Sequence, residues 1–416
     1  VTIAAVSDTA LALSGATNAA LNLVTGTVTA TDAATAAQAV TLAGFAKAVT
    51  YNVTDTAGNL LATQGGLADA VTVTSTTSEL SAANAKLFQA LATVDTKTYT
   101  VRDSEANLTT EAAALTNATL VTVTDALEVA EVLALDTLLA VSVADGTLVY
   151  SVSDTTAQLA DAIGIAGELA VLRGASSVTG TTATLDVTQA TAIGTLLADP
   201  AIDDVTLAYS ISGTASAVAG LSGAVLGGAT AITATGAAIT AVQASSILGA
   251  QNSGATLIDE VTGTAAQILA LPITSNDTIT TVTVTGTATA QQALDIATLD
   301  ALTGVGTVTI AAVSDTALAL SGATNAALDL VTGTVTATTA ATAAQATALQ
   351  AFTEAVVYSV SDTGANVVAQ IATNTNNNFL DDAVAVTLTG TSTVAQAAAA
   401  EAATNSGTTT VEAIED

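Results

Sequence analysis

The stretch VTIAAVSDTALALSGATNAALNLVTGTVTATDAATAAQA at residues 1–39 returns almost unchanged 307 residues later, at residues 308–346. Only two positions differ between the copies: Asn22 becomes Asp329, and Asp32 becomes Thr339. An enzyme rarely needs two near-identical copies of one surface, whereas a periodic structure is built from them. The duplication therefore predicts a repetitive architecture.

A shorter period lies within the long one. Runs of alternating β-branched residues, such as GTVTATD, VTYNVTD, LVTVTD and TVTVTGT, recur about every 25 residues, which is a spacing typical of solenoid repeats. Each run ends in a turn that contains Ser, Thr, Asp or Gly. An Ala-, Leu- and Gln-rich run with strong helix propensity then follows. Each period thus reads as strand, turn and helix.

This order predicts parallel strands, because the chain must return through the helix before it begins the next strand. We expect an α/β repeat: a solenoid of strand–turn–helix units with one long parallel sheet. An all-β parallel β-helix is the alternative, because several connections are rich in Gly and Thr. Val, Ile and Leu should face the helices. Thr should form ladders on the opposite face, either in water or against a neighbouring filament.

The domain organisation follows from the two periods. We expect residues 1–416 to form one continuous array, with residues 1–307 as the first long repeat and residues 308–416 as a partial second copy. Val1 corresponds to Val308, which lies inside the running segment LTGVGTVTI. We therefore expect this sequence to be a section of a longer or processed chain.

Composition limits the classes of function. With 36 acidic and 5 basic residues, the chain carries a net charge of −31 and should not bind nucleic acid, which requires a basic surface. The absence of His and Cys removes disulfides, imidazole and thiolate metal ligands, and the usual catalytic bases. The sequence has no uninterrupted apolar run of about 18 residues, so no transmembrane helix is predicted. The acidic surface suits divalent cations.

All five tyrosines occupy the first position of one motif, Y-x-[VI]-x-[DG]-[ST]. The motif reads YNVTDT at Tyr51, YTVRDS at Tyr99, YSVSDT at Tyr150, YSISGT at Tyr209 and YSVSDT at Tyr358. Related units place Ala or Val in the tyrosine position, as in AAVSDT and VTVTDA. The aspartates of these motifs and their relatives are Asp8, Asp55, Asp103, Asp125, Asp154, Asp315 and Asp362.

Two interpretations of these aspartates remain open. In the structural one, Asp or the adjacent Ser or Thr ends the strand and accepts hydrogen bonds from the free amides of the next helix. In the functional one, carboxylates stacked on successive coils bind calcium together with main-chain carbonyls. Gly213, which replaces Asp in the Tyr209 motif, fits a turn position better than a metal ligand. The tyrosines themselves are expected to be packing residues.

The segment YSVSDT-x-A-x-L at residues 150–159 and its relatives resemble repeat-rich bacterial cell-surface proteins, which include surface-layer proteins and giant extracellular repeat proteins. The Ala-, Thr- and Val-rich, Cys-free and acidic composition of the whole chain is similar to theirs. The resemblance implies export, calcium dependence and assembly into sheets or fibres. The glycine-rich calcium repeats that often accompany such proteins are missing here.

We therefore expect a structural protein without enzyme activity. It would be a repeat segment of an extracellular filament, sheath or surface layer that self-associates into a homopolymer and attaches to a cell surface. Solenoid ends would stack head to tail, with additional lateral contacts. An adhesin stalk, with its binding activity outside this segment, is the first alternative. A polysaccharide-active β-helix enzyme is the second, and the scarcity of aromatic and basic residues opposes it.

Overall fold

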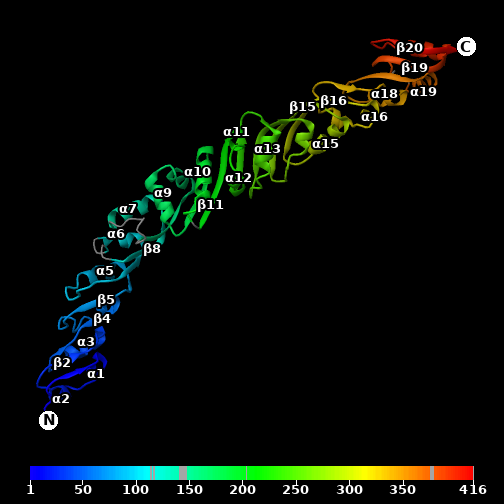
Figure 1. The fold of residues 1–416 in the computed structure, drawn as a ribbon. Coiled ribbons are helices and arrows are strands. Elements are labelled where there is room, and N and C mark those ends of the chain that lie inside the picture. Colours follow the sequence, from blue (N-terminus) through cyan, green and yellow to red (C-terminus); the bar gives the residue numbers. More distant parts are fainter. Residues whose placement is uncertain (113–114, 116–117, 140–147, 203, 375–378, 416) are drawn as a thin grey trace. The chain divides into compact units, whose positions relative to one another are not determined.

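The computed structural model describes residues 1–112, 115, 118–139, 148–202, 204–374 and 379–415 (Figure 1). Strands and helices alternate along the chain, and the strands of the described residues pair in parallel. The predicted α/β class with a long parallel sheet is therefore confirmed, and the all-β alternative is wrong. The arrangement is solenoid-like.

The parallel strands form one long sheet and two short ones. The long sheet has 15 strands and runs in the order β20-β19-β18-β17-β16-β15-β14-β12-β11-β10-β9-β8-β7-β6, with β13 also paired to β14. Before it in the chain come a three-stranded sheet, β1-β2-β3, and a two-stranded sheet, β4-β5. Strand order thus follows chain order, as expected when each helix returns the chain for the next strand.

The chain divides into two compact units: Val1–Ala183 with Ala192–Ala208, and Thr184–Thr191 with Tyr209–Asp416. Three elements contribute residues to both: β10 (Val178–Leu185), α10 (Val187–Ala198) and β11 (Val205–Thr214).

Among the described residues, unit 1 contains strands β1 to β9 and helices α1 to α9. Its strands are β1 (Val6–Asp8), β2 (Val28–Ala30), β3 (Val49–Thr50), β4 (Val53–Thr56), β5 (Val73–Thr76), β6 (Glu79–Leu80), β7 (Thr100–Asp103), β8 (Leu120–Leu127) and β9 (Leu148–Thr155). Its helices are α1 (Ala10–Ser14), α2 (Asn18–Leu21), α3 (Ala36–Ala43), α4 (Ala57–Ala62), α5 (Ala82–Gln89), α6 (Glu105–Thr110), α7 (Val129–Leu139), α8 (Thr156–Ala162) and α9 (Ala166–Gly174). Many strands are short, but their buried side chains join one hydrophobic core.

Unit 2 has longer strands in the same order of elements. Its strands are β12 (Ala231–Thr235), β13 (Ile239–Thr240), β14 (Thr256–Gly263), β15 (Asp277–Ala288), β16 (Val305–Asp315), β17 (Val335–Ala337), β18 (Val356–Thr363), β19 (Ala383–Thr393) and β20 (Thr409–Glu415). Its helices are α11 (Ala215–Val218), α12 (Gly223–Gly228), α13 (Ala241–Leu248), α14 (Ala265–Leu269), α15 (Ala290–Asp300), α16 (Ala317–Leu320), α17 (Asn325–Leu328), α18 (Ala343–Gln350), α19 (Gly364–Thr373) and α20 (Val394–Glu401).

We call a strand, together with the helix or helices that follow it, a coil. The β15–α15 coil shows why these sequences fold in this way. Val282 pairs with Val308 of β16, and Val284 pairs with Ile310, so apolar side chains stack in register and are almost fully buried. Helix α15 buries Ala290 and residues three and six positions later against them. Small alanines let helix and sheet approach closely, which suits the Ala-rich composition.

Threonines occupy the outward positions between these buried residues. Thr262 pairs with Thr283, and Thr283 pairs with Thr309, so three successive strands present one row of hydroxyls. These side chains are half-buried, whereas their apolar neighbours in the strands are buried. The expected separation of Val and Ile from Thr is therefore confirmed in these strands.

The two sequence copies adopt the same elements. Helices α1, α2 and α3 begin at residues 10, 18 and 36, and helices α16, α17 and α18 begin 307 residues later, at 317, 325 and 343. In both copies a glycine, Gly15 or Gly322, lies between the first two short helices. In these coils the Ala-rich run that the sequence predicts to be helical is therefore divided into two short helices, because glycine disfavours a helix interior.

Candidate functional site: aspartates between helix N-termini

The seven candidate aspartates all lie in a strand that leads into a helix. Asp8, Asp103 and Asp315 are the last residues of β1, β7 and β16. Asp55 and Asp154 lie one residue before the end of β4 and β9, and Asp362 takes the same position in β18. Asp125 lies within β8. The structure therefore repeats one position of the coil and does not gather these residues around a single centre.

One carboxylate oxygen caps the coil's own helix. The Oδ1 atom accepts a hydrogen bond from the main-chain amide of the following residue, the helix N-cap, at 2.7–2.9 Å in six of the seven. The N-cap Ser or Thr in turn accepts a bond from the amide three residues later, as at Thr56 and Ser104. This is the helix-entry role that the sequence suggested.

The other oxygen reaches the helix of the preceding coil. Asp55 Oδ2 accepts from Ala36 N at 2.9 Å, Asp103 Oδ2 from Ala82 N at 2.9 Å, and Asp362 Oδ2 from Ala343 N at 3.0 Å. Asp154 Oδ2 accepts from Val129 N, and Asp315 Oδ2 accepts from Ala290 N. Both oxygens of Asp125 accept from Glu105 N. Five aspartates therefore bond to the N-termini of two helices, that of their own coil and that of the preceding coil. They are Asp55, Asp103, Asp154, Asp315 and Asp362.

The duplicated segment shows that a hydroxyl can replace a carboxylate as the acceptor of the hydrogen bond between coils. Asp32, which the motif did not include, accepts a hydrogen bond from Ala10 N at 2.6 Å. At the equivalent position of the second copy, Thr339 accepts from Ala317 N through its hydroxyl at 3.0 Å. One of the two differences between the copies therefore preserves the hydrogen bond between coils.

Hydrogen bonding lowers the pKa of three of these carboxyls. Partial burial of Asp55 and Asp362 alone would raise their pKa values, but bonds from Asn59 or Asn366 and from two main-chain amides outweigh it. At Asp103, the bond from the Asn107 side chain is the largest influence and lowers the pKa. The carboxylate form is therefore favoured in the folded protein.

Several coils that lack an aspartate directly before the N-cap use glutamine for the same amide. The side chain of Gln292 accepts from Thr289 N, while Thr289 Oγ1 accepts from Gln292 N, which is a capping box. The other capping boxes pair Thr35 with Gln38, Thr240 with Gln243, Thr264 with Gln267, Thr342 with Gln345, and Thr393 with Gln396. The spacing Thr-x-x-Gln could have revealed these caps from sequence alone.

The tyrosines are packing residues, as expected. All five are at most 2% exposed. The hydroxyls of Tyr51, Tyr150, Tyr209 and Tyr358 each donate to a main-chain carbonyl 15 to 21 residues further on, at 2.6–2.8 Å. The Tyr99 hydroxyl accepts a hydrogen bond from the side chain of Gln89. Burial raises the pKa of all five hydroxyls.

Calcium binding by these aspartates stays a prediction. In the described part of the chain, no three Asp or Glu side chains lie close enough together to hold one metal ion. The carboxylate oxygens also accept amide hydrogen bonds, so a calcium ion would have to draw most of its six to eight oxygen ligands from main-chain carbonyls and water. The residues therefore fit a helix cap better than a dedicated metal site.

No protein-family model matches this sequence, and no match to it is found among the curated proteins. Within the described residues, no helix has the length and apolar character needed to span a membrane. The function must therefore be argued from the geometry of the coils.

Proposed function

We propose that this chain is a structural protein, a repeat segment of an extracellular filament, sheath or surface layer, and not an enzyme. One observation carries the proposal: the helix cap of one coil is completed by a side chain of the next coil. A coil of this kind is stable as part of a stack. The near-identical segments at residues 1–39 and 308–346 then offer near-identical surfaces for stacking.

Assembly would occur by head-to-tail stacking of coils and by lateral contacts. Within the described residues β20 pairs with β19, and its side chains are mostly exposed, including Ile414 at 59%. A head-to-tail contact of this kind does not close on itself and produces an open fibre or layer. Attachment of the assembly to a cell surface and a role for calcium belong to the same proposal.

Electron microscopy of the purified chain, with and without a calcium chelator, tests the proposal. We expect filaments or sheets whose amount rises with protein concentration. Discrete particles at every concentration would contradict assembly and would favour the adhesin stalk. Polymers that persist in the chelator would contradict only the role of calcium.

A further inference from the structure

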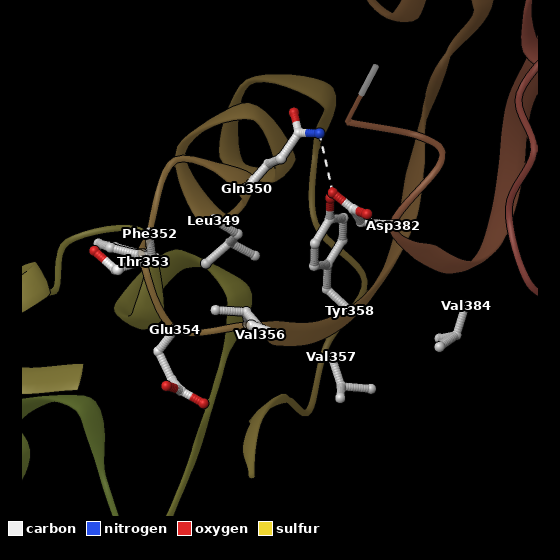
Figure 2. Close-up of a pocket in the computed structure, with 11 residues that line it drawn as sticks. Leu349, Gln350, Phe352, Thr353, Glu354, Val356, Val357, Tyr358, Asp382 and Val384 are labelled. Carbon is white, nitrogen blue, oxygen red and sulfur yellow. Dashed lines mark hydrogen bonds between the residues drawn. The ribbon is translucent and has the colours of Figure 1, made fainter. Parts of the chain in front are cut away.

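Unit 2 carries a surface pocket of about 400 Å³ where α18 leads into β18 (Figure 2). Phe352, Val357 and Val384 contribute apolar walls, and the two valines are 41% and 42% exposed. At outward positions of β14, β15 and β16 the sheet carries Thr, whereas here valines are exposed on two adjacent strands. The pocket therefore has the apolar surface that a docked side chain would bury.

Two carboxylates line the same pocket. Asp382 accepts a hydrogen bond from the side-chain amide of Gln350 at 3.0 Å, while Glu354 lies at the other end of the view in Figure 2. Unit 2 contains no Lys or Arg at all, because every basic residue of the sequence falls within unit 1. The negative charge of the pocket therefore has no counter-charge in its own unit.

The equivalent loop in unit 1 has the opposite charge. Residues 42–51 read LAGFAKAVTY and residues 349–358 read LQAFTEAVVY, so Lys47 takes the position of Glu354. Among the described residues, Lys47 forms no ion pair, whereas Lys86 and Arg173 are paired with carboxylates. Phe45 beside it is half-buried, and Val40 is 44% exposed. The loop thus combines a free ammonium group with apolar surface.

We propose that the pocket at Glu354 binds the Lys47 loop of a second copy of this chain. The aliphatic stem of the lysine would lie against Phe352 and Val357, and its ammonium group would meet the Glu354 carboxylate. The contact rests on the proposed function, for which it supplies a lateral partner. Because it joins different surfaces of two molecules, it continues from copy to copy as an open array.

Charge reversal tests this contact. In about 0.15 M salt, where the Debye length is about 8 Å, Lys47→Glu or Glu354→Lys should each raise the dissociation constant for self-association by at least about tenfold, since like charges would then meet. The double variant Lys47→Glu/Glu354→Lys should restore it. Matched controls are Arg102→Glu and Glu401→Lys, which change the net charge equally at exposed positions and should leave association nearly unchanged. Sedimentation velocity over a concentration series measures each constant.

Carbodiimide cross-linking of a mixture of ¹⁴N- and ¹⁵N-labelled protein identifies the partner. We expect cross-linked peptides that join Lys47 and Glu354 and carry both isotopes. If every Lys47–Glu354 cross-link carried a single isotope, the contact would lie within one chain and the proposal would be overturned, because a contact between copies must also give mixed cross-links. Single variants no weaker than their controls, or a double variant that is not restored, would overturn it too. Filaments that survive in those variants would leave the structural function standing without this lateral contact.

Discussion

At the scale of single residues, the aspartate that ends a strand is the group that links one coil to the next. Its carboxylate offers two oxygens in a fixed geometry, and in five coils each oxygen accepts an amide from a different helix N-terminus. An amide at a helix N-terminus has no partner within its helix and favours a negative acceptor. One short side chain therefore satisfies two helices at once.

The two sequence copies predict how substitutions at Asp32 behave. Asp32→Thr should change the free energy of unfolding by less than about 0.5 kcal/mol, because Thr339 already provides the same hydrogen bond in the second copy. Asp32→Ala leaves Ala10 N without this acceptor and should cost about 1 kcal/mol. Urea unfolding of the two variants side by side measures the difference. Equal losses in both would contradict the role of the acceptor.

The lowered pKa values predict acid sensitivity. Because Asp55, Asp103 and Asp362 hold their protons more weakly in the folded chain than in the unfolded one, their stabilisation is complete above the ordinary pKa of about 4. It is lost as the pH falls through the lower folded values, where the unfolded chain binds more protons. Denaturant unfolding between neutral and acidic pH should show this decline.

The triple variant Asp55→Asn/Asp103→Asn/Asp362→Asn provides the control for acid sensitivity. It should be less stable at neutral pH, and its stability should depend less on pH between about 5 and 2. A pH dependence as steep as that of the unchanged chain would show that other carboxylates are responsible.

At the scale of the elements, the size of the first side chain of a helix decides whether an aspartate of the following coil fits beside it. Helices whose first amide donates a hydrogen bond to an aspartate of the following coil mostly begin with Ala, as α3, α5, α15 and α18 do. Helix α7 begins with Val129, and its bond to Asp154 is the longest of the set, at 3.3 Å. Helix α10 begins with Val187, and the following coil has Gly213 in the aspartate position.

Gly213 therefore predicts a compensating pair of substitutions. A Cβ atom at Gly213 would lie 2.6 Å from Val187 Cγ2, so Gly213→Asp should destabilise the chain by about 1–3 kcal/mol. In Val187→Ala/Gly213→Asp, the small first residue should admit the carboxylate and recover part of this loss. A double-mutant cycle from thermal unfolding measures the coupling. Strictly additive losses would refute the steric explanation.

Local patterns in the sequence predicted most of the elements, because the Val–Thr alternation and the Ala-rich runs act over a few residues. The caps within one helix follow from local spacing too, as at Thr289 and Gln292. The bond from Asp55 to the preceding helix could not be predicted in the same way. Its partner lies 19 residues earlier and that of Asp154 lies 25 residues earlier, so the match depends on strand register and coil length.

At the scale of the whole molecule, unit 1 and unit 2 share a coil design but differ in charge and strand length. All the cations are in unit 1, whereas the longest strands are in unit 2. In a stack of this kind, stability is approximately a sum of coil contributions and interfaces between neighbours. Removing one complete coil should therefore be tolerated far better than removing part of one.

Deletion of residues 264–288 tests this additivity. It joins Gly263 to the N-cap Thr289, so that β14 leads directly into α15 and one whole period is lost. We expect a folded chain with a cooperative transition and somewhat lower stability. Deletion of residues 277–288 alone removes β15, leaves α14 running into α15, and should abolish the native transition of unit 2. Circular dichroism during urea unfolding distinguishes the two outcomes, and similar damage from both deletions would contradict the additive description.

The direction of the hydrogen bonds between coils also has a consequence for biosynthesis. Each bond runs from a helix to a carboxylate 19 to 25 residues further along the chain. At about 5–20 residues per second, the ribosome delivers that carboxylate roughly one to five seconds after it has made the start of the helix. The first amide of the newest helix therefore lacks its acceptor until the strand of the following coil has been synthesised. Folding should follow translation one coil behind, so that only the growing end of the nascent chain is exposed to misfolding or proteolysis.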